Sequence, residues 1–541
     1  MHQGQRSETS PVVEQPAAAP PTVGLGPETA GPEVVPRERA RARPTGWQIA
    51  AAIAVAVGIA LRFVARSHLW LDEALSVSIA ELPLRDMSEA LRHDGAPPLY
   101  YVLLHGWMEV FGSSPFAVRA LSGVWAVATL PLIWLAGMRV GGRKVAATAL
   151  LLLAASPFAI RYASEGRMYS LLALLVLAGW LALEDLLERF SWSRAVVLAV
   201  ATGLLLLTHY WAFYVLAVAA VVVGRRAWRG PNRPEARRAA LAMAAGSLLF
   251  IPWVPSFLFQ MRHTGTPWAG GPTFRAMLDT VFHYAGGFWD PAFVLGLVFF
   301  GLILLALFGH PVDGHRILLD LRAQPRARGV LVAGFGPLAL AVVAGMVTQS
   351  AFAARYTALM FPFVVLLVAL GTAALPNPRA HRGVVTLAVV LGLVAVFPGT
   401  LAEKTNAPRV ARTLATEGQP GDVVAYCPDQ VGPSVAHLLP PDNQLVHLTF
   451  PSGGRPERVD WVNYEKRNES ASTADFAQML LDRAGPTRTI WVVWAPGYRT
   501  FGTRCELLID RLTKARPEMD RTVKLSKKAL ERTGLVRFRP G

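Results

Sequence analysis

Long apolar blocks constrain this chain more than any other feature of its sequence. Stretches of roughly 15 to 22 mostly apolar residues recur along much of the chain, separated by short polar or basic segments, and each is about as long as a helix that crosses a bilayer. The 541 residues are 53% hydrophobic, but a soluble protein of this length would disperse its apolar residues among polar ones. The sequence therefore predicts a mainly helical, polytopic membrane bundle.

The formal net charge of +16 does not by itself indicate a nucleic-acid partner. The arginines gather in short segments beside the apolar blocks, at residues 37–43, 225–238 and 316–328. Positively charged residues prefer the cytoplasmic ends of membrane helices, which explains these groups. The sequence contains no stacking platform or recognition motif for nucleic acid, so we expect no such partner.

The same basic segments predict the orientation of the helices. Residues 1–44 are rich in Pro, Ala and Glu, which is typical of a disordered tail and not of a signal peptide, and we expect this tail in the cytoplasm. We predict a transmembrane domain over 45–398 with about eleven spans. Its first span, 47–65, leads outward to an external loop, 66–116, that contains interfacial helices. The later spans are expected at 117–138, 145–160, 169–187, 195–208, 211–223, 239–259, 291–309, 329–348, 357–375 and 383–398.

The composition changes after about residue 400. The segment GDVVAYCPDQVGPSVAHLL indicates a strand, a turn and a helix, RTIWVVWAPGY a buried strand, and ELLIDRLTKA a further helix. This alternation predicts a small α/β domain over 399–541, on the outer face of the membrane. Both cysteines of the chain, Cys427 and Cys505, lie in it. An oxidising outer face would permit a disulfide, but the sequence does not show whether the two are close.

Two adjacent carboxylates, Asp72 and Glu73, directly follow the first span in the stretch WLDEALSV. An acidic pair held against a membrane carries a desolvation penalty, so it usually has a function or a partner. The alternative is a hydrated loop in which both acids pair weakly with Arg62 and Arg66. Position alone does not decide between these interpretations.

Several motifs, in order along the chain, resemble those of the GT-C glycosyltransferases. They are DEA after the first span, Asp94 followed by PPLYY, the run FGSSPFAVRALSGVWAVATLPLIWLAG and the loop SPFAIRYASEGRMYSLLAL. The pattern is similar to bacterial proteins that resemble glycosyltransferase family 39, which are protein mannosyltransferase-like, and to aminoarabinose transferases. The resemblance covers residues 47 to about 225, is looser up to 398 and does not include the final domain.

The resemblance implies an enzyme that takes a hexose or pentose from a polyprenyl-phosphate carrier and inverts the anomeric centre. It implies that Asp72 is the general base, that Glu73 is its acidic neighbour and that Asp94 is the second acidic position of the loop. Gly-Ala precedes Pro97 where relatives often have His or Asn, which weakens the case for Asp94. The chemistry agrees, because an acceptor hydroxyl needs a carboxylate to take its proton. The leaving phosphate needs positive charge, not an acid.

Arginines on the outer face are the candidates for holding the donor phosphate. Arg355 with Tyr356 resembles the basic-aromatic start of a late span that contacts carrier phosphate in related enzymes. Arg161 and Arg167 are further candidates, although both flank Glu165 and pairing with it explains them at least as well. The candidate substrate-pocket residues are Trp70, Tyr100, Tyr101, Glu165 and His209. An interfacial aromatic belt explains the aromatic members equally well, and a structural role is favoured for the histidine.

The three acids of the first loop offer oxygen ligands for a divalent cation, and some GT-C enzymes use one. The relatives that this pattern resembles favour an enzyme with no metal and no other cofactor. The expected partners are a polyprenyl-phosphate sugar, the lipid bilayer and an acceptor hydroxyl or amine on an envelope glycan, lipid or protein.

The alternative function is a transporter or flippase of a lipid-linked envelope precursor, which needs ionisable groups or broken helices inside the membrane. Here the acids gather in one outer loop instead. We therefore expect a multi-pass glycosyltransferase of the plasma membrane, with a cytoplasmic N-terminus and an extracytoplasmic C-terminal domain that helps to bind the acceptor. The sequence identifies neither the sugar nor the acceptor.

Overall fold

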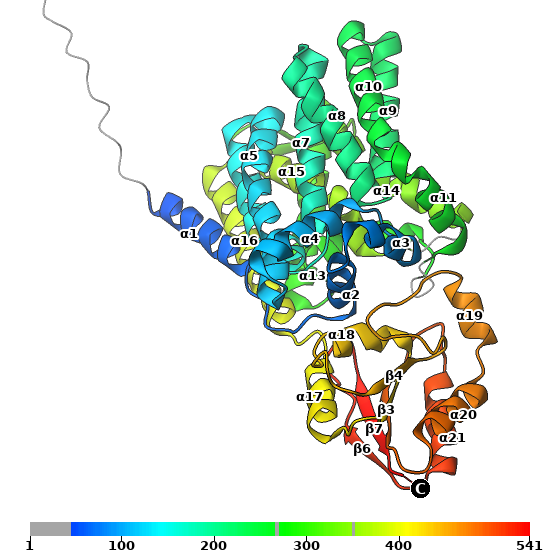
Figure 1. Cartoon of the computed structure of the whole chain (residues 1–541). Helices are drawn as coiled ribbons and strands as arrows, with labels where there is room; N and C mark the ends of the chain where they lie inside the picture. Colours follow the sequence, from blue (N-terminus) through cyan, green and yellow to red (C-terminus); the bar gives the residue numbers. More distant parts are fainter. Residues whose placement is uncertain (1–44, 266–269, 349–351, 541) are drawn as a thin grey trace, which may run out of the picture. The chain divides into compact units, whose positions relative to one another are not determined.

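The computed structural model describes residues 45–265, 270–348 and 352–540, so the predicted tail, 1–44, lies outside the described residues. Up to residue 401 the described chain is built mainly of apolar helices (Figure 1). Six helices in this described part are long and apolar enough to cross a membrane. They are α5 (Pro115–Ala154), α7 (Tyr169–Glu188), the continuous Arg233–His263, α13 (Asp290–Phe308), α14 (Pro325–Thr348) and α16 (Pro378–Leu401). Shorter apolar helices are α1 (Gly46–Leu61), α8 (Trp192–Thr208) and α15 (Phe361–Ala373).

Helix α5 contains the predicted span 117–138 and residues 145–154 of the next predicted span, 145–160. Its dihedral angles are non-helical at Gly141 and Gly142, and the φ of Gly142 is 75°, a value that glycine adopts without steric penalty. A Cβ atom on Gly137 would approach the Cα of Ala146 to 2.5 Å, so the chain reverses at the two glycines and the halves pack side by side. The polytopic helical fold is confirmed, whereas the count of eleven spans stays a prediction.

The other described elements of this region are short or lack the hydropathy of a spanning helix. They are α2 (Leu71–Ala80), α3 (Leu84–Asp94), α4 (Leu99–Phe111), α6 (Pro157–Ala163), α9 (Ala212–Arg229), α12 (Phe274–Tyr284), η2 (Ala354–Leu359) and the hairpin of β1 (Gly309–Pro311) and β2 (Ile317–Leu319). The continuous segment Arg233–His263 consists of α10 (Arg233–Ser247), η1 (Leu248–Trp253) and α11 (Val254–His263). Helices α2 to α4 lie within the predicted external loop. Helix α2 is almost wholly buried, which holds its first turn, with Asp72 and Glu73, in a fixed place.

The C-terminal region is the predicted α/β domain, with a five-stranded mixed sheet in the order β4-β3-β5-β7-β6. Strand β3 (Val423–Cys427) is parallel to β4 (Val446–Thr449) and β5 (Ile490–Trp494), while β7 (Gly534–Phe538) is antiparallel to β5 and β6 (Met519–Val523). The helical elements are α17 (Ala407–Glu417), η3 (Asp429–Val431), α18 (Gly432–Ala436), α19 (Tyr464–Ser470), α20 (Thr473–Ala484) and α21 (Arg504–Ala515).

Helices cover both faces of this sheet (Figure 1). Alternate residues of a strand point to opposite faces: Val423 and Ala425 pack in the cluster with α20 and α21, whereas Val424 and Tyr426 pack in the cluster with α17 and α18. The strands are therefore apolar on both sides, which explains why the sequence indicates buried strands.

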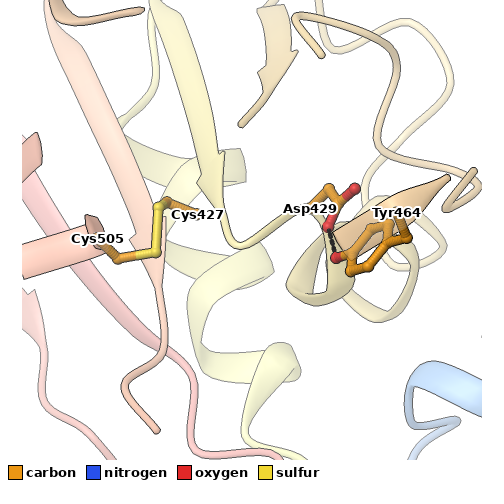
Figure 2. The surroundings of a disulfide bond; sticks show 4 residues. All are labelled: Cys427, Asp429, Tyr464 and Cys505. Carbon is orange, nitrogen blue, oxygen red and sulfur yellow. Dashed lines mark hydrogen bonds between the residues drawn. A yellow bond between two sulfur atoms is a disulfide. The ribbon is translucent and has the colours of Figure 1, made fainter. Parts of the chain in front are cut away.

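Cys427 and Cys505 form a disulfide that joins the end of β3 to the start of α21 (Figure 2). Asp429, two residues further on, is 4% exposed, and the Tyr464 hydroxyl donates a 2.5 Å hydrogen bond to its Oδ1 (Figure 2). Burial raises the pKa of Asp429 to about 7, against the opposing effects of Tyr464 and Arg467. Burial likewise raises the pKa of Glu531, also 4% exposed, to about 7.

These two carboxyls predict a pH-dependent stability. In the unfolded chain they ionise near pH 4, whereas in the folded chain they keep their protons until about pH 7. The folded state therefore binds more protons between these values, and the free energy of unfolding falls as the pH rises from about 4 to about 7. Each pKa unit corresponds to about 1.36 kcal/mol, so the loss is on the order of a few kcal/mol per group.

Asp429→Asn and Glu531→Gln should each reduce the fall in the free energy of unfolding between about pH 4 and about pH 7. Thermal midpoints of the full-length protein in detergent, measured at several pH values, provide the comparison with the wild type. Asp482→Asn on exposed α20 is the control and should keep the wild-type slope. Identical slopes in the wild type and both test variants would contradict the burial argument.

Candidate active site

Asp72 and Arg355, distant in the sequence, meet in the structure. Asp72 lies in the first turn of α2, and Arg355 lies in η2 before α15. The Arg355 Nη1 is 3.0 Å from the Asp72 Oδ2, and the two side chains are 20% and 19% exposed, respectively. The predicted base and the predicted phosphate ligand therefore form one partly accessible ion pair.

Glu73 is fully buried and has a different environment. Arg119 from α5 donates to both carboxylate oxygens, with Nε 2.7 Å from Oε1 and Nη2 2.6 Å from Oε2, and the Gly166 N–H donates to Oε1 at 2.9 Å. Burial favours the neutral acid, but the positive charges of Lys404 and Arg119 outweigh it and hold the pKa of Glu73 below its usual range. Glu73 is thus an ionised carboxylate that is already occupied by its partners.

Arg119 also fixes the segment before α2. It donates to the carbonyl oxygens of Ser67 and His68, at 2.6 and 3.1 Å. Our sequence reasoning missed Arg119, which interrupts the apolar run FAVRALSG; a lone arginine in such a run is a signal for a buried ion pair. Residue 166 must be glycine for this packing, because a Cβ there would lie 2.7 Å from the Cγ1 of Val118.

Asp94 and Arg167 lie near Asp72: the Arg167 Nη1 is 3.4 Å from the Asp72 carbonyl oxygen, and the charge of Asp72 acts on Asp94. The Tyr101 hydroxyl donates to the Asp94 Oδ2 at 2.9 Å, and the Arg167 Nη1 donates to the Ser76 Oγ at 2.8 Å and lies 3.5 Å from the Tyr101 hydroxyl. Burial raises the pKa of Asp94, opposed by Arg167 and Tyr101 and reinforced by the charge of Asp72. The structure thus brings the three predicted acids and two of the predicted arginines into one region.

Aromatic rings adjoin this region. The His209 ring lies 5.0 Å from the Tyr356 ring and 6.5 Å from the Tyr169 ring. Burial of His209, together with the charges of Arg167 and Arg355, lowers its pKa to about 3. Its imidazole is therefore neutral at physiological pH and contributes no positive charge to anion binding.

The remaining predicted site residues are placed as follows. Tyr100 is fully buried and packs edge-on against Tyr101 and Trp125. Arg161 is exposed and lies beside the Tyr162 ring. Glu165 forms its ion pair with Lys404, at 3.7 Å, and Arg161 and Arg167 are not its partners. Trp70 packs, together with Leu71, against the core of the C-terminal domain.

Lys404 is the second residue that our sequence reasoning missed. It follows α16 in the stretch AEKTNAP, where a basic residue on the predicted outer side departs from the usual bias of membrane loops. That departure is the signal that could have singled it out. Within the described residues, no group of three or more His, Cys, Asp or Glu is arranged to hold a metal ion.

Part of this sequence matches a protein-family model, and the structure resembles solved structures of known proteins. Residues 95–255 match the family described as dolichyl-phosphate-mannose-protein mannosyltransferase. The crystal structure of ArnT from Cupriavidus metallidurans in the apo state matches with a TM-score of 0.59 and 14% identity, over 91% of this chain and 98% of that one. ArnT bound to undecaprenyl phosphate matches with a TM-score of 0.55 and 12% identity over the same shares. No curated protein matches the sequence.

The ArnT match shows the fold, and the family model covers the segment that contains Tyr101, Arg119 and Arg167. The predicted fold is thereby confirmed: the chain has an ArnT-like GT-C fold, and residues 95–255 are similar to the mannosyltransferase family. The comparisons give no support to the transporter alternative.

The contrast between Asp72 and Glu73 yields a prediction about stability. Glu73→Gln leaves the buried charge of Arg119 without its counter-ion, and breaking such a pair costs about 3–5 kcal/mol. We expect a lower yield of folded protein and a lower thermal midpoint in detergent. Asp72→Asn, at the neighbouring, partly exposed position, is the matched control and should change the midpoint far less. Equal midpoints for the two variants would refute a structural role for Glu73.

Proposed function

We propose that the protein transfers a sugar from a polyprenyl-phosphate donor to an acceptor hydroxyl or amine of the cell envelope, with inversion at the anomeric carbon. The observation that carries this proposal is the contact between Asp72 and Arg355, whose charged atoms lie 3.0 Å apart. One residue can take a proton from the acceptor, and the other can neutralise the departing phosphate. The structure of ArnT with undecaprenyl phosphate supports the donor class.

In this reaction the acceptor oxygen or nitrogen attacks the anomeric carbon and its proton passes to the Asp72 carboxylate. The bond between the anomeric carbon and the phosphate oxygen breaks, and its electron pair remains on the polyprenyl phosphate. A carboxylate alone suffices for the proton transfer, because the leaving group is a stabilised anion that needs no acid catalyst.

Arg355 would hold the leaving phosphate. A guanidinium presents a planar fork of donors that matches phosphate oxygens. In comparable oxyanion sites, one preorganised contact of this kind lowers the activation barrier by about 2.7–4 kcal/mol. When the donor binds, its phosphate competes with Asp72 for Arg355. This competition would leave Asp72 available to the acceptor at the moment when the donor is in place.

Tyr101, Asp94 and Arg167 would support this arrangement as positioning residues. Arg167 donates to Ser76 on α2, four residues after Asp72, and the Ser76 hydroxyl donates to the carbonyl oxygen of Asp72 at 2.7 Å. The orientation of the base is therefore tied to the Arg167 side chain. The second charge, on Arg167, adds to the positive field that the phosphate meets.

We propose that the site faces the outside of the plasma membrane, with the N-terminus in the cytoplasm. The basic segments between the helices support this orientation, as does the disulfide of the C-terminal domain, since disulfides persist in oxidising compartments. The donor would enter from the outer leaflet, with its polyprenyl chain in the bilayer.

Replacement of the base tests the mechanism. Asp72→Asn keeps the size of the side chain but cannot accept the proton, so we expect transfer to fall on the order of 100- to 10,000-fold. Full-length protein is incubated with envelope membranes and undecaprenyl phosphates that carry labelled mannose, arabinose or aminoarabinose. The measured quantity is label released from the carrier into glycan, lipid or protein.

The matched control is Asp86→Asn in the same loop, whose side chain is 54% exposed; it should keep wild-type transfer. Wild-type rates in Asp72→Asn would refute the assignment of the base.

We further propose that the transfer is independent of divalent cations. Each of the three acids of the candidate site already has its own partner: Asp72 pairs with Arg355, Glu73 pairs with Arg119, and Asp94 accepts a hydrogen bond from Tyr101. Arginine would supply the charge on the phosphate that a metal supplies elsewhere.

Treatment of the wild-type enzyme with EDTA should therefore leave the transfer rate unchanged, and added Mg²⁺, Mn²⁺ or Zn²⁺ should not raise it. Loss of activity in EDTA that one of these ions restores would overturn cation independence, while leaving the assignment of Asp72 to its own test.

A further inference from the structure

The linker between α16 and the C-terminal domain holds Lys404 in a fixed position beside the active site. The backbone N–H of Lys404 donates to the Ser67 Oγ at 2.9 Å, and its carbonyl oxygen accepts from the Glu531 N–H at 2.8 Å. Thr405 continues this attachment through a parallel bridge to Glu531. The residue is thus fastened on one side to the segment before α2 and on the other to the C-terminal domain.

The side chain of Lys404 is 15% exposed, and its Nζ lies 3.7 Å from the Glu165 Oε2 and 5.9 Å from the centre of the Trp70 ring. An ammonium group has three N–H donors, and buried donors are almost always hydrogen-bonded. Within the described residues this Nζ has no hydrogen-bond acceptor. Glu165 balances its charge at a distance longer than a hydrogen bond.

Trp70 presents a second donor of the same kind. Its indole Nε1 is buried and has no acceptor within the described part of the chain. Trp70 is two residues from Asp72, and its ring packs on the core of the C-terminal domain. The Lys404 ammonium thus lies between the Trp70 ring, at 5.9 Å, and the 3% exposed Glu165 carboxylate, at 3.7 Å, and this group begins two residues before the proposed base.

We propose that Lys404, Trp70 and Glu165 form a subsite for the hydroxyl groups of a sugar ring. Sugar hydroxyls would accept hydrogen bonds from the Lys404 ammonium and the Trp70 indole and donate one to Glu165, while the Trp70 ring packs against a face of the sugar. The inference rests on the proposed transferase function and adds Lys404 as a substrate-binding residue that the linker supplies.

The charges of the subsite favour a neutral polyol over an anion. Lys404 and Glu165 cancel each other, so a phosphate or carboxylate that approached the ammonium would also meet the Glu165 carboxylate. The donor phosphate has its own arginine, Arg355, on the other ion pair. Loss of Lys404 should therefore weaken binding of the sugar and not of the carrier phosphate. The sugar of the donor and a sugar of the acceptor both offer hydroxyl groups. The experiment therefore measures donor binding and acceptor kinetics separately.

The test uses full-length protein in detergent with Lys404→Met, which keeps the aliphatic stem, and Trp70→Phe, which keeps a ring but removes the indole N–H. Lys404→Arg preserves the charge, and Lys528→Met, at an exposed lysine of the same domain, is the control. Binding is titrated with undecaprenyl phosphate and with mannosyl, arabinosyl and aminoarabinosyl undecaprenyl phosphates. Kinetic constants for the acceptor are taken from the transfer assay, and thermal midpoints report folding.

A donor-sugar subsite predicts that Lys404→Met binds bare undecaprenyl phosphate like the wild type but binds its sugar-bearing form roughly 10- to 100-fold more weakly, as for the loss of a hydrogen bond to a charged group. An acceptor-sugar subsite predicts unchanged donor binding and a similar rise in KM for the acceptor. In either case Trp70→Phe changes the same constant, the Kd for the sugar-bearing donor or the KM for the acceptor, to a smaller extent. Lys404→Arg keeps that constant close to its wild-type value, and Lys528→Met leaves it unchanged.

Equal weakening of bare and sugar-bearing carriers in Lys404→Met would overturn the subsite, and so would wild-type constants throughout. If Lys404→Met lowers the thermal midpoint, Trp70→Phe and Lys404→Arg provide the test. Wild-type binding of the sugar-bearing carriers together with a wild-type KM for the acceptor in Trp70→Phe then overturns the proposal. A wild-type protein that binds carrier lipids but transfers no sugar contradicts the proposed function instead, and leaves the binding comparison intact.

Discussion

The arrangement of the candidate active site depends on the buried ion pair between Glu73 and Arg119. Taking both charges out of water is expensive, and the expense is offset only because the geometry is bidentate and the remaining donors reach backbone oxygens. The pair fastens the start of α2 to α5 and, through Gly166, to the loop before α7. Asp72 is the adjacent residue in the first turn of α2, so it is thereby held in place, with its side chain partly exposed.

Around this anchor the site is assembled from segments that are far apart in the chain. Arg355 reaches Asp72 across 283 positions, and Lys404 reaches Glu165 from the linker that enters the C-terminal domain. Asp72, Glu73 and Glu165 each pair with a cation, and the charge of Arg167 opposes that of Asp94, so the region is close to electrically balanced before substrate binds. A phosphate that took Arg355 would leave Asp72 without this partner, but the Asp72 side chain is 19% exposed and would not be a fully buried lone charge.

The sequence predicted the bundle, the α/β domain and the importance of the first loop because these follow from local pattern: apolar length, alternating strands and helices, and ordered motifs. It could not assign partners. Arg167 is a candidate phosphate ligand in the sequence, with pairing to Glu165 as the alternative, but its side chain bonds Ser76, while Glu165 pairs with Lys404. Such pairings depend on how helices pack, which no local pattern records. The same holds for the disulfide, whose cysteines are separated by 78 positions.

The attachment of Trp70 and Leu71 to the core of the C-terminal domain has a consequence for the ancestry and engineering of such enzymes. The domain is not an independent module joined to a finished helical bundle, because the segment that carries the proposed base is partly built into its hydrophobic interior. A chimera that exchanged this domain between relatives would also have to exchange the segment around α2, and the two would be expected to change together as the lineage diverged.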